Sequence, residues 1–134
     1  MECLTSPRRI ELRCTPEAGK TARDFLDESY CNCHDGRVCE DAALLVSELV
    51  TNAVRHGAPP IVLEVRCGGA QTLEVRVRDG GPGQPLLGNL ADLDREGGRG
   101  VALIDLLSEA WGTETDPSGK TVWFRLNVDS PTKI

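Results

Sequence analysis

The chain has 134 residues, of which 40% are hydrophobic and 27% charged, with a formal net charge of −6 and a sequence pI near 4.9. This composition is typical of a globular domain with a real core and excludes a disordered chain. The acidic balance lacks the basic surface of a nucleic-acid-binding protein, and no apolar run is long enough to cross a membrane.

Residue spacing predicts a strand and two helices in the first part of the chain. Residues 8–13 alternate polar and apolar side chains, which is typical of an edge or half-buried strand. A first helix is expected to begin near Pro16, and a second to extend from about residue 38 to residue 56, where Gly57 closes it. The buried stripe of the second helix is expected to consist of Ala42, Leu45, Val46, Leu49 and Ala53.

The second part of the chain predicts four strands, over residues 61–67, 72–79, 111–114 and 121–128. Residues 82–96 show no clear periodicity and predict a mobile loop, and a third helix is expected over about residues 98–110. The sum is a single α+β domain over residues 1–134, with its core at about 8–126. We expect a two-layer α/β sandwich whose mostly antiparallel mixed sheet carries its helices on one face.

Three polar stretches stand out, and the first lies on the second helix. Glu48, Asn52 and His56 are four residues apart, so each is displaced by about 40° around the helix axis from the last. An amide oxygen beside a carboxylate suits Mg²⁺, and the carboxylate could act as a base. A solvated helix face with a histidine placed favourably at the helix C-terminus explains the same pattern.

The other two stretches are rich in glycine. Asp79 ends a predicted strand and begins the run Asp-Gly-Gly-Pro-Gly, in which a carboxylate can face a flat base and accept from its amino group. Residues 97–100, Gly-Gly-Arg-Gly, lead into the third helix, whose free N–H groups attract an anion. Arg99 adds a positive charge there. A glycine-rich turn and a loosely defined helix start are the simpler explanations.

Two other patterns carry less weight. Cys31, Cys33, His34 and Cys39 lie within nine residues, but no second ligand pair follows, so a zinc site is disfavoured. The six cysteines are expected to be reduced thiols of a cytoplasmic protein, since residues 1–10 contain no apolar signal segment. The Gly-Lys-Thr triplets at 19–21 and 119–121 lack the glycine that a phosphate-binding P-loop requires five residues earlier.

Taken in order, the three polar stretches resemble the motifs of the GHKL ATPase superfamily, whose nucleotide-binding domain is the Bergerat fold. Residues 48–57 resemble its N box, residues 79–83 its G1 box and residues 97–100 its G2 box. Residues 119–121 resemble the segment whose threonine lies near adenine. The resemblance covers nearly the whole chain, from about residue 8 to residue 126.

The resemblance implies a site for ATP and Mg²⁺. By position, Glu48 corresponds to the catalytic base, Asn52 to the Mg²⁺ ligand and Asp79 to the residue that anchors adenine. The other positions that the resemblance and the local pattern place at the nucleotide are Gly81, Gly83, Gly98, Arg99, Gly100 and Thr121. Residues 82–96 would form a lid.

Within the superfamily, the chain is most similar to small anti-sigma factor serine kinases. Residues 47–56, SELVTNAVRH, and residues 119–124, GKTVWF, are typical of that group. The resemblance implies transfer of the ATP γ-phosphoryl group to a serine of an anti-anti-sigma-type protein, control of a sigma factor, and a homodimer. The alternative is an ATP-dependent module that sequesters a partner without kinase activity, for which only the unassigned residues 30–37 hint at a surface.

Overall fold

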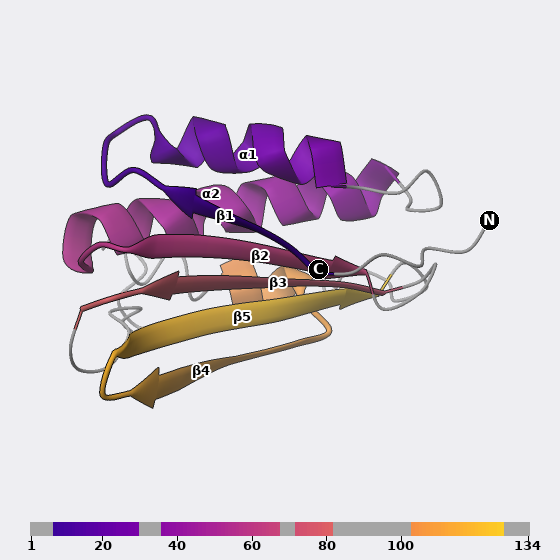
Figure 1. The fold of residues 1–134 in the computed structure, drawn as a ribbon. Helices are drawn as coiled ribbons and strands as arrows, with labels where there is room; N and C mark the ends of the chain where they lie inside the picture. The colour runs from indigo at the N-terminus through magenta and orange to yellow at the C-terminus, as the bar shows by residue number, and fades with distance from the viewer. Residues whose placement is uncertain (1–6, 30–35, 68–71, 82–102, 128–134) are drawn as a thin grey trace.

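The computed structural model describes residues 7–29, 36–67, 72–81 and 103–127. Within these residues the chain forms two layers, a five-stranded sheet and two long helices that cover one of its faces (Figure 1). The elements are β1 Arg8–Leu12, α1 Ala18–Ser29, α2 Gly36–His56, β2 Ile61–Cys67, β3 Thr72–Asp79, β4 Ala110–Asp116 and β5 Gly119–Asn127. The expected two-layer α+β sandwich is confirmed.

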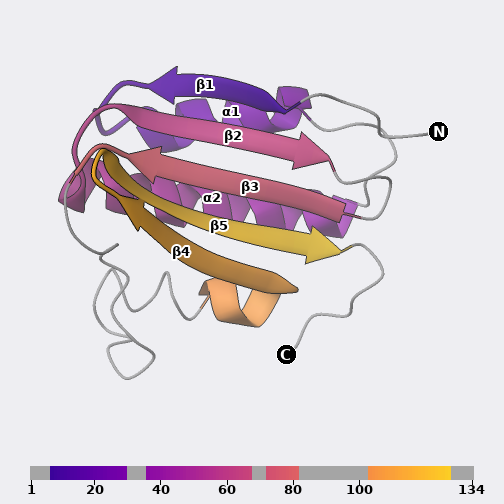
Figure 2. The same ribbon diagram turned by 60° about the horizontal axis from the view of Figure 1, so that its bottom comes forward.

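The strands follow the order β1-β2-β3-β5-β4, which Figure 2 shows from the side of the sheet that the helices leave open. Every pair among the described strands is antiparallel. The parallel component expected of a mixed sheet is therefore not found in this part of the chain. β5 lies between β3 and β4, so the start of β5 is next to the end of β3 in space although about 40 residues separate them in the chain.

Alternation along the strands divides the sheet into a buried and an open face. Side chains on β3 alternate between half-buried and buried, and its buried positions pair with β5: Val75 lies opposite Phe124, and Val77 opposite Val122. Since successive side chains of a strand point to opposite faces, one row meets the helices and the other faces outward. The helix-facing row continues onto β2 through Ile61, Leu63 and Val65.

The helices supply the other half of the core. All five residues of the expected stripe on α2 are buried, and α1 contributes Ala18, Ala22 and Leu26. With 21 residues, α2 is about 31 Å long and runs along the helix-covered face of the sheet, above the strands in Figure 1. Its last turn carries Arg55 and His56, which suits the negative end of the helix dipole. None of the described helices combines the length and apolar character of a membrane span.

The third helix ends at residue 107, three residues earlier than expected. Residues 103–107 are helical and bury Ile104, but Ser108 and Glu109 leave the helix and β4 begins at Ala110. The backbone N–H of Glu109 donates to Arg125 O on β5 at 2.8 Å, so pairing with the sheet replaces the last helical turn. β4 also extends to Asp116 and β5 begins at Gly119, so both strands are longer than predicted. The expected start of this helix, residues 98–102, lies outside the described residues.

Candidate nucleotide-binding site

Asp79 lies at the end of β3 with its carboxylate held from two sides. The residue is 6% exposed. The Gly81 backbone N–H and the Lys120 ammonium both donate to Asp79 Oδ1, each at 2.8 Å. Neither contact uses Oδ2, and Asp79 has no third hydrogen bond within the described residues. One oxygen is thus fixed by the protein while the other stays available as an acceptor.

The sheet register explains why these two charged groups meet. Asp79 is in phase with the buried residues of β3, so its side chain points to the helix-covered face. Lys120 on β5 is its direct partner across the antiparallel pair. Both side chains are almost fully enclosed, with exposed fractions of 9% for Asp79 and 7% for Lys120. The strands therefore place an ion pair inside the end of the domain rather than on its surface.

Glycines allow the backbone to close around this pair. A Cβ at Gly57, just after α2, would lie 2.5 Å from Asp79 Cγ, and one at Gly81 would lie 2.8 Å from Lys120 Nζ. Gly119 has a φ of +155° and a Cβ there would collide with Asp79 O. Gly81, one of the expected nucleotide-site glycines, thus lies against this pair, as do Gly57 and Gly119, which lie within the matched motifs but were not assigned a role at the nucleotide.

Asn52 and Glu48 lie on α2, upstream of Gly57. Asn52 is buried, at 8% exposed, and its Nδ2 has no hydrogen-bond partner among the described residues. It precedes Gly57 by five residues, which is about 7.5 Å along the helix axis, and half-buried Glu48 lies about 6 Å further on. From its C-terminal end beside Asp79, α2 therefore carries first the buried amide of Asn52 and then the carboxylate of Glu48.

Thr121, expected near adenine, does not lie beside Asp79. It is buried, but it projects from the opposite face of the sheet, where Arg78 Nη1 donates to its Oγ1 at 3.3 Å. Lys120, its neighbour in the same segment, lies beside Asp79 instead. Strand alternation was the signal that could have found it, because Lys120 is in phase with Val122 and Phe124 and Thr121 is not.

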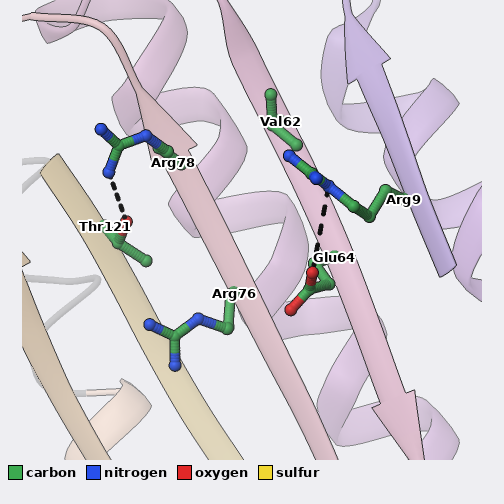
Figure 3. Close-up of a pocket in the computed structure, with 6 residues that line it drawn as sticks. All are labelled: Arg9, Val62, Glu64, Arg76, Arg78 and Thr121. Carbon is green, nitrogen blue, oxygen red and sulfur yellow. Dashed lines mark hydrogen bonds and ion pairs between the residues drawn. The ribbon is translucent and has the colours of Figure 1, made fainter. Parts of the chain in front are cut away.

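The open face of the sheet carries ion pairs and a pocket of about 80 Å³, shown in Figure 3. The residues that line the pocket are Arg9, Val62, Glu64, Arg76, Arg78 and Thr121. Arg9 pairs with Glu64 at 3.9 Å and Arg76 with Glu114 at 2.6 Å. This pocket lies on the side of the sheet away from Asp79, so it is not part of the candidate site.

Arg78 anchors the end of this face. Its Nη2 donates to Asp116 Oδ1 at 2.9 Å and to Ser118 Oγ at 2.7 Å. Hydrogen bonds from Arg78, and from the side chain and backbone N–H of Ser118, hold the pKa of Asp116 well below its ordinary value. The bond to Asp116 in turn raises the pKa of the Arg78 guanidinium.

Several predicted residues cannot be placed. Gly83, Gly98, Arg99 and Gly100, and the expected lid over residues 82–96, lie outside the described residues. The same holds for Cys31, Cys33 and His34, and the described part of the chain contains no group of three His, Cys, Asp or Glu side chains that could hold a metal. Cys14 is an exposed free cysteine in this part of the chain.

Comparisons with known proteins identify the family. Residues 12–126 match the family model of the histidine kinase-like ATPase domain. None of the curated proteins compared with the chain matches it. The fold resembles the crystal structure of the RsbU and RsbW domains of Rv1364c from Mycobacterium tuberculosis, with a TM-score of 0.71 and 24% identity. That match covers 96% of this chain and 34% of the other, so this chain spans about a third of that length. The predicted GHKL resemblance is confirmed: the chain belongs to the family of histidine kinase-like ATPase domains.

Proposed function

We propose that the chain is an ATP-dependent regulatory protein kinase that transfers the γ-phosphoryl group of ATP to a serine of an anti-anti-sigma-type protein and thereby controls a sigma factor. The observation that carries the nucleotide site is a line of three polar groups along the last half of α2. Among the described residues, Asp79 Oδ2 accepts no hydrogen bond at one end, Asn52 Nδ2 has no partner, and Glu48 follows along the helix. The family supports ATP as the nucleotide.

The residues present fit a magnesium nucleotide. A buried amide without a partner is costly, and a bound group that supplies an acceptor or a metal ion would remove that cost. Asn52 can offer its oxygen to Mg²⁺ and its N–H to a phosphate oxygen. When bound, Mg²⁺ would offset the negative charge of the phosphates. Asp79 would orient the base, and the glycines at positions 83, 98 and 100, with Arg99, would contact the phosphates.

Glu48 is proposed to act on the acceptor serine. As the serine Oγ attacks the γ-phosphorus, Glu48 accepts the hydroxyl proton, the bond to the β-phosphate oxygen breaks, and ADP leaves. Most of the rate enhancement in such a transfer comes from positioning and charge stabilisation rather than from covalent chemistry. Glu48 is proposed to contact the acceptor hydroxyl and not to bind the nucleotide, so its removal should lower the rate of transfer and leave the affinity for ATP unchanged.

The test is Glu48→Gln, measured for Mg-ATP affinity by calorimetry and for transfer with labelled ATP and a set of candidate acceptor proteins. We expect affinity within about threefold of the wild type and transfer reduced by at least a hundredfold, the usual contribution of a general base. Glu40→Gln is the matched control, because Glu40 is exposed on the same helix, two turns upstream. It should leave both quantities unchanged.

Two results would overturn the proposal in different ways. An unchanged rate of transfer in Glu48→Gln would show that Glu48 is not the general base. Tight ATP binding with no labelled acceptor for the wild type would favour the alternative, an ATP-dependent module that sequesters its partner. A cell fractionation and a measurement of molar mass in solution address the expected cytoplasmic location and homodimer.

A further inference from the structure

Lys120 is a buried lysine whose ammonium has a single hydrogen-bond partner within the described residues. Its Nζ donates to Asp79 Oδ1 at 2.8 Å. An ammonium has three N–H donors, so two of them have no acceptor in this part of the chain. Leaving the donors of a buried charged group unused costs free energy. Two donors of Lys120 are therefore left for acceptors that a bound ligand could supply.

The pair is also held in one place. A Cβ at Gly81 would be 2.8 Å from Lys120 Nζ and 3.0 Å from Asp79 Oδ1, so the backbone lies directly against both groups. The Gly81 N–H donates to the same carboxylate oxygen, Asp79 Oδ1, that accepts from Lys120. Asp79 Oδ2 and two of the Lys120 N–H donors, which make no hydrogen bond among the described residues, are thus held side by side by contacts that tolerate little movement.

Such an adjacent acceptor and donor is complementary to one edge of adenine. The 6-amino group of adenine donates a hydrogen bond, and the neighbouring ring nitrogen N1 accepts one. Guanine reverses this polarity, since its O6 accepts and its N1 carries a hydrogen. We propose that Lys120 determines base specificity by donating to adenine N1 while Asp79 Oδ2 accepts from the 6-amino group. This inference rests on the proposed ATP site and adds a residue to it.

The first experiment measures the affinity of the wild-type protein for three nucleotides by calorimetry with Mg²⁺ present. In 1-deaza-ATP a C–H replaces N1, whereas in 7-deaza-ATP the change is on the other ring. 1-Deaza-ATP cannot accept the proposed hydrogen bond from the charged Lys120 ammonium. It should therefore bind at least tenfold more weakly than ATP. The affinity for 7-deaza-ATP should stay within about twofold. Equal binding of ATP and 1-deaza-ATP would overturn the inference.

The second experiment asks whether Lys120 is the donor. Lys120→Met keeps a chain of similar length and removes the ammonium, so the variant should bind ATP and 1-deaza-ATP within about twofold of each other. If Lys120 only oriented Asp79, the substitution would lower the affinities for ATP and 1-deaza-ATP by the same factor. The tenfold preference for ATP would then remain, which would contradict the inference. Arg76→Met makes the same charge change on the open face and should keep the preference.

The outcomes separate this inference from the function on which it rests. Failure of the wild type to bind any of the three nucleotides would overturn the ATP site itself. Binding of ATP without discrimination against 1-deaza-ATP would overturn only the role of Lys120. Circular dichroism shows whether Lys120→Met is folded, and if it is not, the wild-type series still gives a decisive result.

Discussion

Two ion pairs at the same end of the sheet differ in their surroundings. Asp79 and Arg78 are neighbours on β3, and each pairs with a residue near the turn between β4 and β5. The Asp79–Lys120 distance is 2.8 Å and the Arg78–Asp116 distance is 2.9 Å. The side chains of the first pair are 9% and 7% exposed, whereas those of the second are 32% and 49% exposed. Alternation along one strand separates them onto opposite faces.

The comparison shows that similar geometry does not imply a similar role. An exposed pair is screened by water and salt and contributes little to stability. A buried pair loses hydration on both charges, so apolar residues of similar size would often serve the fold as well or better. The Asp79–Lys120 pair is therefore better explained by what it does for a ligand than by its net contribution to folding.

The largest expected effect comes from removing one partner of the buried pair. Lys120→Met leaves the Asp79 carboxylate buried without its counter-ion, so we expect the free energy of unfolding to fall by about 3–5 kcal/mol. Urea denaturation at neutral pH measures it. Arg78→Met is the matched substitution on the other face and should cause a much smaller loss. Equal losses in the two variants would show that the faces do not differ as described.

A smaller effect is expected from crowding the buried pair. In Gly57→Ala the new Cβ would be 2.5 Å from Asp79 Cγ and 2.7 Å from Ala53 O, so we expect a loss of about 1–3 kcal/mol together with weaker ATP binding. Gly19→Ala is the control, because a Cβ there would be no closer than 3.7 Å to its neighbours, in Thr51 and Arg23. Since alanine favours the helix, this control should be as stable as the wild type or more so. Similar losses in both variants would contradict the close packing at Gly57.

The smallest expected effect concerns acid and the exposed pair. The folded state lowers the pKa of Asp116, so its contribution to stability is present above the unfolded value of about 3.9 and is lost as pH falls through the folded value. Below about pH 4, the wild type should therefore lose stability more steeply than Asp116→Asn. Urea denaturation between pH 7 and pH 2.5 measures this difference. Parallel pH profiles would contradict the role of the Arg78 and Ser118 contacts.

Much of the fold could be predicted because the strands and helices keep strict periods. The stripe on α2 and the alternation on β2 and β3 each reveal one apolar face, and the structure buries these faces against one another. The end of the third helix could not be predicted in this way. Residues 108–110 have side chains that are compatible with a helix. They leave the helix because the Glu109 N–H donates to Arg125 O on β5, a contact that the local sequence does not reveal.

The candidate site was predicted less completely than the fold. The motif led to Asp79 and Gly81, which the structure brings together, and to Asn52, whose buried Nδ2 has no partner among the described residues. It also led to Thr121, which projects from the other face, because a motif gives the order of residues and not the face on which each lies. The contact of Lys120 with Asp79 depends on the register of β3 and β5, which a local pattern does not contain.

The central claim, that Asp79 on the helix-covered face holds the base of ATP, is tested most directly by calorimetry of Mg-ATP binding. The wild type should bind, and Asp79→Asn should bind at least tenfold more weakly, because the amide removes the charge that orders Lys120 and weakens the acceptor. Asp116→Asn makes the same change on the open face and should bind like the wild type. Equal affinities in all three proteins, or no binding by the wild type, would contradict the claim.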